Sequence, residues 1–178
     1  MEVVLKLNAR LQPMHRHELE DAIQGVLEKE QMGEVTGGGT VQNPDGEIVS
    51  CDIDIHLAGD KWDHVSFLVN LLNRLGIPNG SALLGIDRKF RVEVGTLAYY
   101  LNNTDLPDVV YETCDINHVV EQMELAMKGI GGLYSYWESD AYTALYFYGN
   151  SYSEMKQKIE PFVATYPLCQ ESRIEQIA

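Results

Sequence analysis

The chain of 178 residues carries 27 acidic and 13 basic side chains, for a net charge of −14, and 45% of its residues are hydrophobic. This length and composition suit a globular fold of one domain or two small ones, and the sequence has no low-complexity tract and no long Pro/Gly/Ser linker. The negative charge repels phosphate backbones and anionic lipids, so we expect neither nucleic-acid nor membrane binding. No apolar run approaches the ~20 residues of a membrane span.

Each of the predicted elements in the first half follows from a local pattern. Alternating apolar residues predict strands, the i, i+3, i+4 spacing predicts helices, and Asn43-Pro44-Asp45-Gly46 predicts a tight turn. In chain order the predictions are a strand over residues 2–9, a helix over 16–29, a strand over 35–41, a strand over 47–57, a helix capped by Asp60 and a strand over 82–86.

The second half repeats this order. The predictions are a strand over residues 90–101, an acidic loop over 102–108, a helix capped by Asp115, a hairpin of 133–138 and 141–148 turning at Ser139-Asp140, a helix opened by a Ser151/Glu154 capping box, and a strand over 173–177. Residues of the 47–57 strand and the helix after it match residues ninety positions later, as in Val65 with Met155 and Val69 with Ile159. Matching core positions favour an internal duplication.

The order strand, helix, hairpin, helix, strand resembles the ferredoxin-like split βαβ topology. We therefore predict an α+β protein with a tandem duplication of a ferredoxin-like βαββαβ unit, in which each of two four-stranded antiparallel sheets has helices on one face. The predicted units are residues 1–88 and 89–178, closely packed because the connection between them is short. Each half has a net charge of −7.

The strand over residues 47–57 carries the first candidate site. Asp52, Asp54 and His56 alternate with apolar residues, so they project together from the uncovered face of the sheet. Such a row can bind a polar ligand, or it can simply pair with polar residues of the neighbouring strand. Its side chains are ~6.6 Å apart along the strand, too far for one ion, so we expect no metal site.

Two weaker signals lie nearby. The run Gly37-Gly38-Gly39 can approach an anionic ligand closely, or it can mark a bulged strand. Cys114 precedes a predicted helix start with His118 four positions later, but no third catalytic group accompanies the pair, so we predict no catalytic residue and no cofactor. The three cysteines, Cys51, Cys114 and Cys169, are too far apart in sequence for a zinc knuckle or disulfide framework.

The ten tyrosines all lie between positions 99 and 166. Alternation places Tyr142, Tyr146 and Tyr148 on the strand face opposite Leu145 and Phe147, with Tyr134 and Tyr136 on the partner strand. If helices cover the Leu145 side, these five tyrosines line an open sheet face. Two interpretations stay open: the face binds a partner, or it packs internally on the other half.

These patterns predict a non-enzymatic acidic binding protein that acts through protein–protein interaction. A basic partner suits the charge, and an inhibitor or immunity-type protein that neutralises a basic toxin is one form; a homodimer is a further option. The alternative is a small-molecule sensor or an enzyme that uses a cleft between the halves. Free thiols and an N-terminus that starts directly on a strand lead us to expect a cytoplasmic protein.

Overall fold

The computed structural model describes residues 1–59, 62–86, 88–89 and 94–178. The chain divides into two compact units, Met1–Glu93 and Val94–Ala178, and each is described by itself. The predicted helix cap Asp60 lies outside the described residues. No helix of the described part of the chain is long and apolar enough to cross a membrane.

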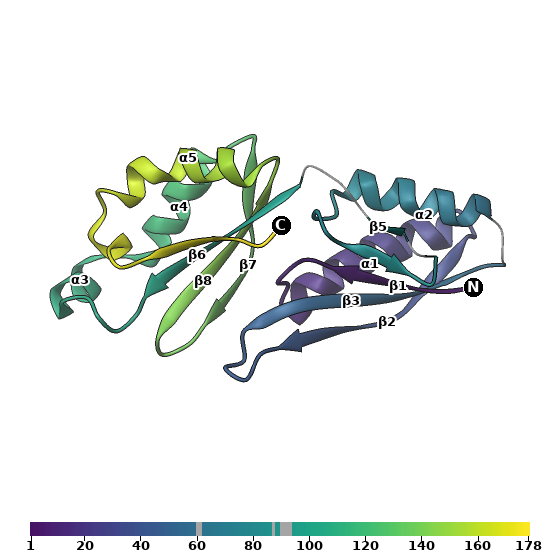
Figure 1. Cartoon of the computed structure of the whole chain (residues 1–178), viewed down its shortest axis with the longest axis horizontal. Coiled ribbons are helices and arrows are strands. Elements are labelled where there is room, and N and C mark those ends of the chain that lie inside the picture. The colour runs from purple at the N-terminus through teal and green to yellow at the C-terminus, as the bar shows by residue number, and fades with distance from the viewer. Residues whose placement is uncertain (60–61, 87, 90–93) are drawn as a thin grey trace. The chain divides into compact units, whose positions relative to one another are not determined.

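The first unit has two helices on one face of an antiparallel sheet (Figure 1). Its elements are β1 (Glu2–Leu7), α1 (Pro13–Lys29), β2 (Gly33–Gln42), β3 (Ile48–Leu57), α2 (Trp62–Leu75), β4 (Ala82–Leu84) and β5 (Arg88–Lys89). The strand order is β2-β3-β1-β4-β5. The pairing of β5 with β4 adds a short fifth strand to the expected four, and it carries the unit past the predicted division at residue 88.

Alternation along β1 and β3 decides which face of this sheet is covered. Val3, Leu5 and Leu7 pair with Ile55, Ile53 and Cys51, and all six are buried beneath the helices. The helices contribute the other side of this core, with Ile23 and Leu27 from α1 and Leu68 and Leu72 from α2. The hairpin between β2 and β3 turns as predicted, because the Asn43 side chain accepts hydrogen bonds from the backbone N–H groups of Asp45 and Glu47.

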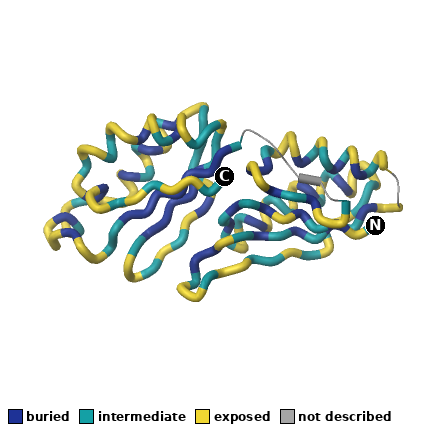
Figure 2. Tube along the Cα trace, in the orientation of Figure 1, coloured by how far each residue is buried: buried dark blue, intermediate teal, exposed yellow. Residues whose placement is uncertain are grey.

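The second unit repeats the architecture. Its elements are β6 (Gly95–Asn102), α3 (Asp108–Thr113), α4 (Ile116–Ala126), β7 (Gly131–Glu138), β8 (Tyr142–Gly149), α5 (Tyr152–Val163), the 3₁₀ helix η1 (Pro167–Cys169) and β9 (Arg173–Gln176). The strand order β7-β8-β6-β9 corresponds to β2-β3-β1-β4 of the first unit. The fold is therefore a duplicated ferredoxin-like α+β fold. Figure 2 shows the most continuous burial along β6 and β8, the two central strands.

Most of the predicted end signals in this unit are confirmed. Asp115 caps α4 by accepting the backbone N–H of Asn117 at 2.8 Å, and Ser151 caps α5 by accepting that of Glu154 at 3.4 Å. Ser139 closes the β7–β8 hairpin through hydrogen bonds with Tyr142. Helix α3 was not predicted, because its six residues are too few to show a helical period.

Candidate functional site

The row of Asp52, Asp54 and His56 lies on the face of the first sheet that carries no helices. Its neighbours on β1 are Lys6 opposite Asp52 and Glu2 opposite His56. The imidazole of His56 forms a hydrogen-bonded pair with the carboxylate of Glu2, and both side chains are exposed. Exposed pairs of this kind contribute ~0–1 kcal/mol. The arrangement matches ordinary cross-strand pairing, and no group of three metal-type ligands occurs among the described residues.

The glycine run on β2 makes room for charged side chains on both faces of the sheet. A β-bulge between Val35 and Gly37 shifts the register, and the carboxylate of Asp52 lies so close to Gly39 that an added Cβ would be 2.9 Å from Oδ2. On the other face, a Cβ on Gly38 would be 2.6 Å from the carboxylate of Glu20. The run is thus a bulged strand that admits these side chains.

The Arg16 side chain of helix α1 is buried beside the glycine run of β2. The Arg16 guanidinium donates from Nε to Glu20 Oε1 at 2.7 Å and from Nη1 to Thr40 Oγ1 at 2.7 Å. Arg16 is 8% exposed, so its desolvated charge needs both partners. The bond to Thr40 joins α1 to β2, and Glu20 of the same helix balances the buried charge, so we interpret Arg16 as structural.

The tyrosine face of the second unit is only partly as predicted. Tyr142, Tyr146 and Tyr148 share one side of β8, opposite Leu145 and Phe147, and helices cover the Leu145 side. However, Tyr146 is 0% exposed, in a cluster with Ala98, Tyr100 and Ala144. The small alanines leave space for the large rings of their neighbours. The centre of the tyrosine face is therefore buried, not exposed to a partner.

The five tyrosines do not share one face, because β7 contains a β-bulge between Leu133 and Ser135. After the bulge, Tyr136 is opposite Leu145 and points to the helix-covered side. Trp137, rather than Tyr136, lies beside Tyr142 on the tyrosine face. Tyr134 meets the Tyr148 ring edge to face, with centroids 5.8 Å apart, and is 63% exposed. A bulge moves every later side chain to the opposite face.

Arg173, which the sequence patterns did not single out, lies against the rings at the edge of the tyrosine face. The Arg173 guanidinium of β9 lies 3.7 Å from the centre of the Tyr100 ring and 4.8 Å from that of Tyr142. Its Nε donates to Glu175 Oε1 at 2.8 Å. Cation–π contacts of this type contribute ~0.5–2 kcal/mol, so Arg173 fastens β9 to the aromatic cluster.

The three thiols differ in their surroundings. Burial raises the pKa of Cys51 and of Cys169, and it raises the pKa of the Tyr99 hydroxyl, which donates to Ser172 at 2.9 Å. Cys114 is half-buried at the end of α3. Its predicted partner His118 instead packs on the rings of Phe162 and Tyr166. These surroundings do not form a nucleophile–base pair.

A pocket of about 600 Å³ opens at the Asn102 end of β6. It is lined by Leu101, Asn103, Tyr111, Cys114, Asp115, Ile116, Glu138, Ser139, Asp140, Thr143 and Leu168. The polar floor is held in place, because the Asn103 amide donates to the Ser139 carbonyl and to Thr143 Oγ1, each at 3.0 Å. We call this site the carboxylate pocket, after its three acidic side chains.

The carboxylate pocket has no clear signature in the sequence, since its residues come from four separate segments. Asp115 was identified only as a helix cap, and Ser139-Asp140 only as a turn. Neither assignment was wrong, but the pocket exists because the start of α4 and the β7–β8 turn meet beside β6. The only signal in the sequence was the density of acidic residues around these two segments.

Comparisons with known proteins add little to this geometry. Neither a protein-family model nor a curated protein matches the chain. Among solved structures it is similar to the ligand-free regulatory subunit of aspartate kinase from Thermus thermophilus, at 11% identity over 90% of this chain and 91% of that one, with a TM-score of 0.29. It is also similar to the first two RRM domains of the yeast poly(U)-binding protein Pub1, at 10% identity over 99% of each chain, with a TM-score of 0.25. Scores this low support no argument about function.

Proposed function

We propose that this protein is a non-enzymatic binding protein that engages a basic protein partner, and that the carboxylate pocket receives a lysine or arginine side chain of that partner. The observation that carries the proposal is the chemistry of the pocket. Asp115, Glu138 and Asp140 surround a cavity that also has apolar walls. No ion pair to any of the three occurs in the part of the chain that the structure describes.

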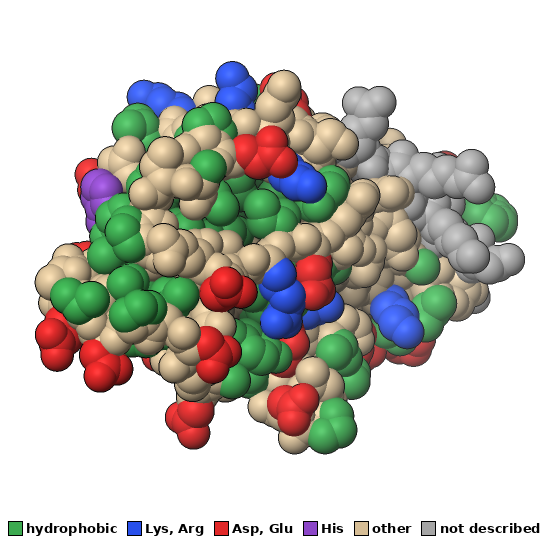
Figure 3. All heavy atoms as spheres, turned by 60° about the vertical axis from the view of Figure 1, so that its left-hand side comes forward, with side chains coloured by type: hydrophobic (Ala, Val, Ile, Leu, Met, Phe, Trp, Pro, Cys, Tyr) green, Lys and Arg blue, Asp and Glu red, His purple; other side chains and the backbone are tan. Residues whose placement is uncertain are grey.

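A long basic side chain is complementary to both parts of this lining. Its methylene groups can cover Leu101, Ile116 and Leu168, while its charged end reaches the carboxylates. One exposed ion pair is worth only ~0–1 kcal/mol, so affinity requires several charges acting together. The pocket supplies three, and further acidic side chains are spread over the face of the molecule that Figure 3 shows.

The overall charge supports a partner that is basic as a whole. A net charge of −14 accelerates association with a cationic protein and slows approach of an anionic one. An inhibitor or immunity-type protein that neutralises a basic toxin is the specific form of this function that fits these traits. The three free cysteines suit a reducing compartment such as the cytoplasm.

The test is a charge-matched pair of double variants. Glu138→Gln with Asp140→Asn removes two charges from the carboxylate pocket, and Glu121→Gln with Glu124→Gln removes two exposed charges from α4. The probe is a fluorescent peptide rich in lysine and arginine, titrated by anisotropy at low and high salt. A neutral peptide of the same length serves as the second control.

We expect the pocket variant to weaken peptide binding about three- to tenfold more than the α4 variant, and added salt to weaken binding by the unchanged protein. Equal effects of the two variants would show that only net charge matters and that the pocket is not the site. Binding of the basic peptide that does not respond to salt would contradict the electrostatic basis of the proposal.

A further inference from the structure

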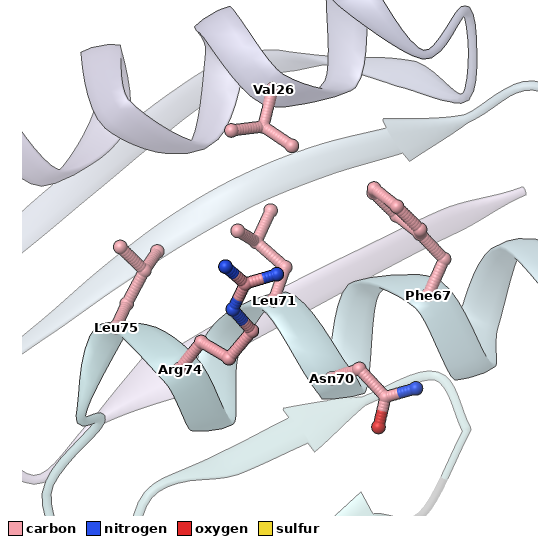
Figure 4. Close-up of a pocket in the computed structure, with 6 residues that line it drawn as sticks. All are labelled: Val26, Phe67, Asn70, Leu71, Arg74 and Leu75. Atoms are coloured by element: carbon pink, nitrogen blue, oxygen red, sulfur yellow. The ribbon is translucent and has the colours of Figure 1, made fainter.

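An apolar groove of about 470 Å³ lies between the two helices of the first unit. Val26 of α1 faces Phe67, Leu71 and Leu75 of α2 across it, and Arg74 lies at its border (Figure 4). In that view the side chain of Arg74 extends to the same side of α2 as those of Leu71 and Leu75, whereas the side chain of Asn70 points away. The groove is thus an apolar channel with one cation beside it.

The groove results from a second apolar stripe on α2. Val65, Leu68 and Leu72 are buried against the sheet. Phe67, Leu71 and Leu75 repeat every four residues, so they form a separate row on the same helix. The corresponding helices of the second unit close this gap, because the rings of His118 on α4 and Phe162 on α5 lie 5.9 Å apart.

Arg74 gives the groove a positive charge, although the chain as a whole is negative. The chain has about two acidic residues for each basic one, yet none of the described residues that line the groove is acidic. Arg74 is exposed and takes part in no ion pair with another described residue. A guanidinium binds a carboxylate through two parallel hydrogen bonds, and it does so best where an apolar wall excludes water.

We propose that this groove binds a small amphiphilic carboxylate, with the carboxylate on Arg74 and the apolar chain lying along Leu71 towards Phe67. The volume is within the ~300–1,000 Å³ of small-molecule sites, which are mostly apolar with few polar groups. Phe67 and Leu75 are eight positions apart, or about 12 Å along the helix, which suits an acyl chain of medium length. This site is separate from the carboxylate pocket in residues, unit and ligand charge.

Charge complementarity favours this ligand over a second copy of the chain, whose net charge of −14 would oppose association. Carboxylate binding in the groove also depends on Arg74. Arg74 lies in the last turn of α2, where the helix dipole is negative. A carboxylate is therefore repelled at this end of α2 unless Arg74 binds it.

The test uses three probes with the same ten-carbon chain: decanoate, 1-decanol and decyltrimethylammonium. Each is titrated into the full-length protein by calorimetry, below the concentration at which it forms micelles. We expect decanoate to bind most tightly, although the net charge of the protein favours the cation. Equal or tighter binding of the cationic probe, or no decanoate binding at millimolar concentration, would overturn the proposal.

Variants then locate the site. Arg74→Gln should weaken decanoate binding about tenfold and remove its advantage over decanol. Lys158→Gln makes the same charge change at an exposed position of α5 and should have no effect. Val26→Glu, which puts a negative charge into the groove, should abolish decanoate binding while the circular dichroism spectrum stays unchanged. If Arg74→Gln and Lys158→Gln bind decanoate equally, the groove is not the site.

Discussion

Replacing Tyr146 with alanine tests whether the tyrosine face of the second sheet is part of the core. Alternation along β8 alone permits either an exposed or an internal ring. In the structure Tyr146 is 0% exposed, directly opposite Ala98 of the neighbouring strand and in one buried cluster with Tyr100 and Ala144. Its loss should therefore resemble a core truncation.

The magnitude follows from this burial. Removing a fully buried aromatic ring costs ~3–5 kcal/mol, from the lost burial of apolar surface and from the cavity that remains. Neither Ala98 nor Ala144 can extend into the space that the ring leaves, so little relaxation is expected. For a unit of this size, ~3–5 kcal/mol lowers the melting temperature by more than ~10 °C.

The assay uses one tryptophan in each unit. In a Trp62→Phe background, Trp137 reports only the second unit, and its ring lies 5.2 Å from Tyr142 in the cluster under study. Guanidinium denaturation followed by Trp137 fluorescence then gives the free energy of unfolding for Tyr146→Ala and for its control, Tyr134→Ala. Tyr134 is 63% exposed, so the control should lose about 1 kcal/mol or less.

A loss below about 1 kcal/mol for Tyr146→Ala would refute the argument. It would mean that the ring is exposed in solution, and the tyrosine face would again be a candidate binding surface.

Two further predictions concern glycines and thiols. Gly38→Ala should destabilise the first unit by ~1–3 kcal/mol in a thermal melt, because its Cβ would be 2.6 Å from the Asp52 carbonyl oxygen. Gly25→Ala has nothing within 4 Å of its Cβ and should stabilise α1 by ~0.5–1 kcal/mol. A Gly25→Ala variant less stable than Gly38→Ala would contradict the packing at Gly38. Iodoacetamide at mildly alkaline pH should label Cys114 before Cys51 and Cys169, as mass spectrometry can show, because burial raises the pKa of the latter two thiols. Since a raised pKa favours the protonated thiol in the folded state, these two cysteines stabilise the fold below about pH 9, and that contribution should be lost as the pH rises further; a free energy of unfolding that rose above this pH would contradict the assignment.

Much of the fold could be predicted because its signals are local. Alternation along residues 47–57 and 141–148 identified the central strands, and along 47–57 it also identified the buried face. The turn at Asn43-Pro44-Asp45-Gly46 and the caps Asp115 and Ser151 marked element ends through hydrogen bonds to neighbouring residues. Each of these features depends on residues within a few positions of one another.

The faces of β7 could not be predicted in this way. Leu133 to Trp137 present large side chains at nearly every position, so the sequence does not indicate which set is buried. A one-residue bulge then moved Tyr136 to the covered side and Trp137 to the aromatic cluster. Bulges depend on how a strand fits its partner, and the sequence of one strand does not contain that information.

The amino-acid sequence by itself determined the two α+β units, the net negative charge and the covered side of the first sheet, because periodicity and charge are properties of the chain. Only the tertiary structure decided where the two pockets form. The carboxylate pocket joins the start of α4, the β7–β8 turn and the end of β6, and the apolar groove requires α1 and α2 to stand apart along Val26 and Leu71. Both sites depend on distances between segments remote in sequence, and those distances are set by how the helices pack on the sheet.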